Sequence, residues 1–519
     1  MAHSRVSVAR GATSLYVANV VALVANTLYF LILTNILRST LDVGILTALN
    51  LMIWFLVTVS ILAQPVTVQS PIPAPLAVLK FIPELIARKA RPSAGRILGL
   101  SMGIAAAIAT AIGAVLIVSP GLVTPLLGGT AVLPMYIQLS AIDVILLSLG
   151  QVCIASLIAG GEMRSATIYI ILWSVIRYAL ASLLLFNYAI TGVLVGWIIG
   201  DGVLLAVALR KSVGTFWVGR GGTVEFSISE FARYSSITFV SALIGYAINQ
   251  ADKLFTLAQQ GLPQLAIYNV AIVAASFTGL APYALTTVLL PALSSLHASN
   301  GVAEMRELVQ HYSRYVSIIV IPVAVGFASI TEVALRIFGP AYVAGFMPSV
   351  IVSLATGLTA VGAVYAAVLL ALGELKWYTG ANVIGLGSLA AVAFVATPLL
   401  GLSGPALGRA SLMVLAAVVY AYATLRRGFF ELDAKAFLGA AGSSFLMGAV
   451  VYFALSFFHT FLFELAMLPV VVVVGGVVYL GALRALRLLR KDDLDFIRDI
   501  VPVRAHFLVA IVAKIAGVK

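Results

Sequence analysis

The stretch ATIYIILWSVIRYALASLLLFNYAITGVLVGWIIGDGVLLAVAL, residues 166–209, is apolar for almost all of its length and contains only two charged residues, Arg177 and Asp201. Inside a bilayer the backbone must satisfy its own hydrogen bonds, so a crossing segment is a helix of about 20 apolar residues. The stretch is long enough for two such helices, Ala166–Asn187 and Thr191–Leu209. It therefore predicts two antiparallel transmembrane helices that carry opposite charges.

Apolar blocks of the same length recur along almost the whole chain of 519 residues, and the loops between them are short. Hydrophobic residues make up 62% of the sequence and charged residues only 10%, which is too few to cover a soluble protein of this size. We therefore predict an all-α polytopic membrane protein with about 14 transmembrane helices. The other expected spans are Gly11–Leu37, Val43–Gln64, Ile97–Val118, Leu133–Ala159, Ser236–Ala258, Ala266–Leu290, Val316–Ile337, Phe346–Leu372, Tyr378–Thr397, Leu402–Thr424, Phe437–Phe457 and Leu465–Leu483.

Basic residues account for the net charge of +12, and they are distributed unevenly between alternate loops. One set of loops, together with the C-terminal tail, holds 26 of the 31 basic residues. Cytoplasmic loops are the ones enriched in Lys and Arg, so we expect that side, and both termini, to be cytoplasmic. The basic excess thus indicates topology and contact with anionic lipids, and it does not indicate a nucleic-acid partner.

Arg177 and Asp201 are expected to lie at the same depth in the bilayer. Each is about eleven residues from the turn near Tyr188–Ile190, which at about 1.5 Å per residue gives a depth of roughly 17 Å. A salt bridge between neighbouring helices is therefore available. A static pair that satisfies two buried charges and a pair that opens to bind an anionic substrate or a proton are both compatible with this pattern.

Asp143 is a third charge inside a span, and its own span contains no base. It can share Arg177 with Asp201. A purely structural network of these three residues and a role for Asp143 in proton transfer both remain open.

The second half of the chain carries further embedded polar residues. Asp252 and Lys253 lie in the outer third of the span Ser236–Ala258, and Arg409 lies about one third into the span Leu402–Thr424. We favour a wet cavity for the two bases over snorkelling at the outer edge, because a charge within the membrane usually faces a partner or water. Asn249 lies one turn before Asp252, and Asn26 in the first span is expected mainly to form hydrogen bonds between helices.

The sequence contains none of the common catalytic motifs. It has no Walker motif, no HExxH, no nucleophile elbow and no large loop with paired acids. Its one cysteine, Cys153, lies in an expected span, and no Cys/His cluster could bind a metal. We expect no enzyme activity, no cofactor and no metal.

Six segments carry a resemblance to known proteins: GATSLYVANVVALVANTLYFLILTNILRSTLDVGILTAL from Gly11, PLAVLKFIPELIARKARPSAGRIL from Pro75, ADKLFTLAQQGLPQLAIYNVA from Ala251, LPALSSL from Leu290, IFGPAY from Ile337, and the tail KDDLDFIRDI. They resemble the polysaccharide transporter branch of the MOP flippases, the Wzx-type oligosaccharide-lipid flippases. Together they extend over essentially the whole chain, in the order in which the family has them.

The resemblance implies two six-helix lobes around a central cavity, followed by two further helices. The corresponding boundaries are 1–210 for the N-lobe, 211–235 for a cytoplasmic linker, 236–424 for the C-lobe, 437–483 for the last two spans and 484–519 for a cytoplasmic amphipathic tail. It also implies that the chain is a multi-pass protein of the cell membrane that moves a lipid-linked glycan by alternating access. The expected partners are this glycan, membrane lipids and H⁺ or Na⁺ as coupling ion, with the chain as a monomer.

An anionic pyrophosphate and a glycan require cations and amides in the cavity. The residues that can supply them are Arg177, Lys253, Arg409, Asn26, Asn249 and Asn269. The embedded acids available for ion coupling are Asp143, Asp201 and Asp252.

Three alternatives stay open. A multidrug exporter of the same superfamily usually couples through an acid in the first span, and this chain has none there. A membrane-embedded glycan polymerase or ligase would need a large outer loop with catalytic residues, which this chain also lacks. A lipid scramblase without ion coupling is compatible with the sequence.

Overall fold

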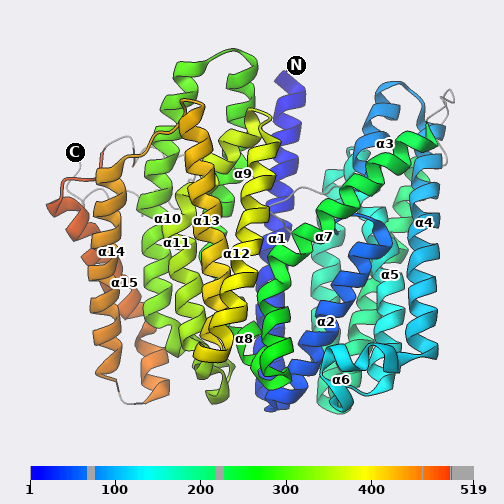
Figure 1. The fold of residues 1–519 in the computed structure, drawn as a ribbon, viewed down its shortest axis with the longest axis horizontal. Helices are drawn as coiled ribbons and strands as arrows, with labels where there is room; N and C mark the ends of the chain where they lie inside the picture. The colour runs from blue at the N-terminus through cyan, green and yellow to red at the C-terminus, as the bar shows by residue number, and fades with distance from the viewer. Residues whose placement is uncertain (1, 67–75, 217–226, 459, 491–492, 494–519) are drawn as a thin grey trace. The chain divides into compact units, whose positions relative to one another are not determined.

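The computed structural model describes residues 2–66, 76–216, 227–458, 460–490 and 493, and their side chains except at 2–16, 281 and 283–288. Within these ranges the regular secondary structure is entirely helical, which confirms the all-α prediction (Figure 1). The helices are α1 (Ala2–Leu37), α2 (Thr40–Ile61), α3 (Ala77–Ala87), α4 (Arg91–Val118), α5 (Pro134–Ala159), α6 (Met163–Phe216), α7 (Ile228–Gln260), α8 (Leu262–Ala275), α9 (Leu280–Ala298), α10 (Val302–Phe338), α11 (Phe346–Ala371), α12 (Leu375–Leu400), α13 (Ser403–Arg426), α14 (Ala434–Ser456) and α15 (Phe461–Ala485).

Thirteen helical segments in the described part are long and apolar enough to cross a membrane. One of them, α6, has 54 residues and breaks at Ala189, where φ is 47° and ψ is −132°. It therefore contains the two expected spans on either side of the predicted turn, and the number of crossings agrees with about fourteen. The chain is a multi-pass membrane protein.

The two arms of α6 fold against each other along a row of glycines. A Cβ at Gly196 would lie 2.4 Å from the Ala181 nitrogen, and one at Gly200 would lie 2.6 Å from the Arg177 Cα. Larger residues could not occupy these positions without separating the arms, as at other close helix contacts in membranes. The glycines thus allow Asp201, next to Gly200, to approach Arg177.

The helices form two compact units, Met1–Asn269 (unit 1) and Val270–Lys519 (unit 2). In unit 1, α5 packs against α2, α3, α4 and α6, and α1 packs against α6. In unit 2, α11 lies between α10 and α13, α12 packs against α13, and α14 packs against α10 and α15. The interior of unit 2 is lined by aliphatic and tyrosine side chains.

Helix α7 belongs to unit 1, although the lobe boundary expected from the sequence placed it in the second lobe. It contacts α2 and α3. The Tyr246 hydroxyl donates to the Leu51 carbonyl at 2.8 Å, and the rings of Phe231 and Phe81 are 5.8 Å apart. These contacts place α7 in unit 1 by packing, whereas the boundary implied by the resemblance precedes the helix.

The expected span Ala266–Leu290 is wrong as one continuous helix. A 3₁₀ turn, Ser276–Gly279, separates α8 from α9. The hydroxyls of Ser276 and Thr278 donate to the carbonyls of Val273 and Ala275, and Pro282 has no N–H with which to continue the α-helical pattern. Local hydrogen bonds and the proline together favour the interruption.

The expected linker at 211–235 is partly helical, since α6 continues to Phe216 and α7 begins at Ile228. The rest of it, at 217–226, lies outside the described residues, as do the proline-rich 67–75 and most of the expected tail at 484–519.

Candidate functional site

Arg177 lies at the centre of a buried ionic cluster in unit 1. Its Nη1 is paired with Asp201 Oδ2, and its Nη2 is 3.2 Å from Asp143 Oδ2. The three side chains are 2%, 0% and 1% exposed, respectively. The sequence-based expectation of one buried group is therefore met in its geometry, and the functional role of the group remains a prediction.

Aromatic side chains surround this cluster. Trp173 Nε1 donates to Asp201 Oδ1 at 2.5 Å, and the Arg177 guanidinium lies 4.9 Å from the centre of the Trp197 ring. On the α1 side, the ring of Tyr29 stacks on Tyr178 at 5.2 Å. A cation beside aromatic faces is stabilised by their electron density, so these rings favour the charged arginine. These rings could not be selected from the sequence, because aromatic residues also occur on the lipid-facing surface.

The cluster is not balanced in charge or in hydrogen bonding. Two carboxylates face one guanidinium, and among the described residues no second base pairs with either acid. Asp143 Oδ1, Tyr29 Oη and Trp197 Nε1 are also buried without a hydrogen-bond partner in the described part. Buried polar atoms are usually satisfied, so the site can accept a proton, a small cation or water.

Asp252, the third acid expected from the sequence, lies apart from this cluster. It is fully buried in α7, and the Tyr268 hydroxyl of α8 donates to it at 2.9 Å. The adjacent Lys253 is partly buried, and the Asn249 amide donates to the Gly245 carbonyl at 2.9 Å within the same helix.

The remaining expected site residues lie on three different helices. Asn26 is partly buried on α1, three residues before Tyr29, and Asn269 is buried on α8. Arg409 is partly buried on α13 in unit 2, whereas Lys253 belongs to unit 1. The shared contact of these two bases with one substrate therefore stays a prediction.

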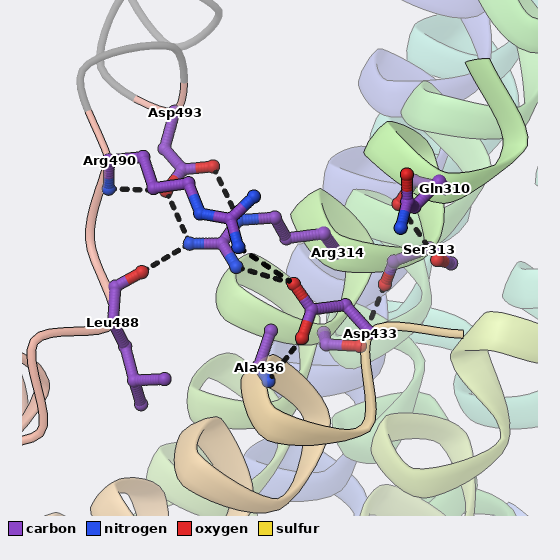
Figure 2. Close-up of polar contacts among 9 residues, drawn as sticks. Gln310, Ser313, Arg314, Asp433, Ala436, Leu488, Arg490 and Asp493 are labelled. Carbon is purple, nitrogen blue, oxygen red and sulfur yellow. Dashed lines mark hydrogen bonds and ion pairs between the residues drawn. The ribbon is translucent and has the colours of Figure 1, made fainter. Parts of the chain in front are cut away.

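Unit 2 contains a second buried ionic cluster, which the sequence did not indicate. Figure 2 shows the Arg314 guanidinium of α10 between Asp433 and Asp493. Its Nη1 donates to Asp433 at 2.7 Å, its Nε and Nη2 donate to Asp493 at 2.9 Å each, and Nη2 also donates to the Leu488 carbonyl. Arg314 is 3% exposed.

The Arg314 cluster holds three parts of the chain together. Asp433 caps α14 by accepting from the Ala436 N–H at 2.9 Å, and Asp493 accepts from the Arg490 N–H at 2.7 Å. Leu488 and Asp493 follow α15. The start of the expected C-terminal tail is thereby tied to α10 and α14.

We expect unit 2 to lose stability in acid through Asp433. Burial disfavours its charge, but the Ala436 N–H and the Arg314 guanidinium outweigh burial and lower its pKa below the usual value. A carboxyl with a lowered pKa contributes fully above its ordinary pKa of about 3.9, and the contribution disappears as the pH falls through the lower folded value. Melting temperatures of the wild type and Asp433→Asn should therefore differ at pH 6, and the difference should shrink as the pH falls below about 4. A constant difference down to pH 2.5 would contradict this.

Glu332 and Arg336 form an i,i+4 pair at the end of α10, with 2.5 Å between Oε1 and Nη2. Glu464 of α15 adds a second acid at 2.8 Å. The three residues line a cavity of about 380 Å³ together with Tyr452 and Phe458. Arg336 and Glu332 are 35% and 41% exposed, so the pair between them contributes little to stability.

No family model matches the sequence, and no curated protein matches it by sequence. Solved structures do match the fold. The lipid II flippase MurJ, in an inward closed conformation, superposes with a TM-score of 0.70 at 14% identity, over 94% of this chain and 99% of that chain.

Two transporters of the MATE type have the same fold over a smaller part of the chain. An inward-facing multidrug resistance MATE family transporter of the MOP superfamily matches with a TM-score of 0.66 at 12% identity, over 79% of this chain and 95% of that chain. The MATE transporter VcmN of Vibrio cholerae, in the bent form, matches at 0.55 and 17% identity, over 82% and 100%. The chain therefore has the fold of the MOP-superfamily transporters.

Proposed function

We propose that this chain flips an anionic lipid-linked oligosaccharide across the membrane by alternating access, driven by an ion gradient. The observation that carries the proposal is the buried cluster of Arg177 with two acids, in a chain whose fold is that of membrane transporters. A charge at this depth is expensive, and functional sites are where membrane proteins most often keep such charges.

The cluster has one more acid than base, which supports a role in coupling transport to an ion gradient. With both carboxylates ionised the cluster carries a net charge of −1 in a medium of low dielectric constant. Binding of a proton or Na⁺ at the unpartnered Asp143 oxygen would neutralise it. Asp201 would keep Arg177 in place, and Asp252, with Tyr268, is a second acid for the same purpose.

The anionic substrate needs positive charge elsewhere. Lys253 and Arg409 are embedded bases, and we assign them to the pyrophosphate of the carrier lipid. Arg177 becomes available to the substrate only when its acids are protonated. The amides of Asn26, Asn249 and Asn269 can bind sugar hydroxyls. We further propose a cell-membrane location with both termini in the cytoplasm, and a monomeric state.

In proteoliposomes containing a labelled lipid-linked glycan, the wild type should accelerate translocation, and Lys253→Ala with Arg409→Ala should slow it at least tenfold. We expect a tenfold lower translocation rate because the double variant loses two charge-assisted contacts with the pyrophosphate. Arg88→Ala with Arg426→Ala removes the same charge from exposed positions and is the matched control. Equal rates in the two double variants would reject the assignment of Lys253 and Arg409.

Multidrug export is the second candidate, because two of the structural neighbours reported above are MATE transporters. The same proteoliposomes, loaded with a cationic dye and given an ion gradient, separate the two functions. Export of the dye without glycan translocation would favour a multidrug exporter. Glycan translocation without dye export would favour a flippase.

A further inference from the structure

A cavity of about 690 Å³ opens in unit 1 at the end of the spans that carries the basic loops. It lies between the start of α4, the α5–α6 turn and the last turns of α6. Its lining is Arg91, Gly160, Glu162, Tyr169, Val207, Arg210, Lys211, Gly214 and Thr215. This volume is typical of a site for a small molecule or a lipid headgroup.

Three bases and one acid give the cavity an excess of positive charge. Lys211 is paired with Glu162 at 3.3 Å. Among the described residues, neither Arg91 nor Arg210 is in an ion pair, although each has a guanidinium that can bind an anion through two hydrogen bonds. Tyr169 adds a hydroxyl. The two arginines thus supply unused charge in a preformed hollow.

An apolar stripe begins beside the cavity. The outward side chains of the first arm of α6 recur at helical spacing at Ile168, Leu172, Val175, Leu183 and Phe186, all substantially exposed. Ile168 is adjacent in sequence to Tyr169, which lines the cavity. In a multi-pass protein such a stripe faces hydrocarbon, so a molecule with its anionic group in the cavity could lay acyl chains along α6.

We propose that this cavity binds the phosphate headgroup of an anionic membrane lipid. Arg91 and Arg210 would bind the phosphate oxygens, and the stripe from Ile168 would contact the acyl chains. Basic pockets between membrane helices at the cytoplasmic surface are suited to such headgroups. The arrangement distinguishes a lipid from free phosphate, because only a lipid uses the stripe. The binding does not require that the chain flips a glycan.

Native mass spectrometry of the full chain in detergent tests the proposal with dioleoyl phosphatidylglycerol, and with dioleoyl phosphatidylcholine as the neutral lipid. Each base near a membrane surface contributes about fivefold to the binding of anionic lipid, so Arg91→Gln with Arg210→Gln should weaken phosphatidylglycerol binding about 30-fold. The matched variant Arg88→Gln with Arg96→Gln, which changes two exposed bases outside the cavity, should leave it within about twofold of wild type.

Three results would overturn the proposal. The first is equal phosphatidylglycerol affinity in the two double variants. The second is equal binding of phosphatidylcholine and phosphatidylglycerol to the wild type. The third is displacement of the lipid by inorganic phosphate or pyrophosphate at equal concentration, which would assign the cavity to a soluble anion. Retention of the lipid in a hundredfold excess of phosphate supports the lipid.

Discussion

Replacing Arg177 by alanine should lower the stability of unit 1 by about 3–5 kcal/mol, because the change leaves two buried carboxylates without their base. The single cysteine of the chain provides the measurement. Cys153 is fully buried in α5, so a thiol-reactive dye reaches it only when unit 1 opens. The dye should react with Arg177→Ala at a much lower temperature than with the wild type.

Lys211→Ala is the comparison, since Lys211 also lies in unit 1 and pairs with an acid, Glu162, but the two side chains are 39% and 37% exposed. Exposed pairs are worth about 0–1 kcal/mol, and this variant should melt almost like the wild type. If Arg177→Ala and Lys211→Ala behaved alike, the Arg177 cluster would not be a buried ionic group in solution.

A triple variant separates structure from coupling. Arg177→Met with Asp143→Leu and Asp201→Leu replaces the whole cluster by apolar side chains of similar size, which is often neutral or stabilising for buried ion pairs. If the cluster only holds helices together, this variant should fold and transport normally. The proposed coupling role requires that it folds but no longer responds to the ion gradient.

Arg177 and its partners could be predicted because depth along a helix is local information. Counting residues from the turn placed Arg177 and Asp201 at one level, and the break at Ala189 lies within the expected turn. Asp143 followed from elimination, since its own span offers no base. The glycines at helical spacing on the second arm of α6 allow the two arms to approach closely. Which atoms these glycines contact is visible only in the structure.

The Arg314 cluster could not be predicted from the sequence, because its members are far apart along the chain. Asp433 and Asp493 are 119 and 179 residues away from Arg314, and no periodicity relates residues at such separations. Arg314 also precedes the apolar part of α10, a position at which a basic residue is ordinarily part of a cytoplasmic loop. In the same way, the interruption between α8 and α9 depends on hydroxyl–carbonyl bonds that hydropathy does not reveal.

Removing Arg314 should release the segment that follows α15. The side chain donates to Asp433, to Asp493 and to the Leu488 carbonyl, so Arg314→Ala takes the buried base away from two acids and one donor away from the carbonyl (Figure 2). The expected cost is about 3–5 kcal/mol. A cysteine placed at Leu488, which is buried, measures the opening when Cys153 is changed to serine. At 3 kcal/mol, and about 1.4 kcal/mol per factor of ten, a thiol reagent should label Leu488→Cys about 150-fold faster.

Arg490→Ala provides the matched control at the same carboxylate. Arg490 is 63% exposed and its Nη2 is 3.7 Å from Asp433, so its removal should change the labelling rate less than about fivefold. Each variant removes one arginine near Asp433, so a difference in labelling rate between them reports the effect of burial of the arginine. Equal acceleration in the two variants would mean that net charge around Asp433 holds the segment. Slow labelling in both would mean that hydrophobic packing of Leu488 against α14 holds it without the ionic cluster.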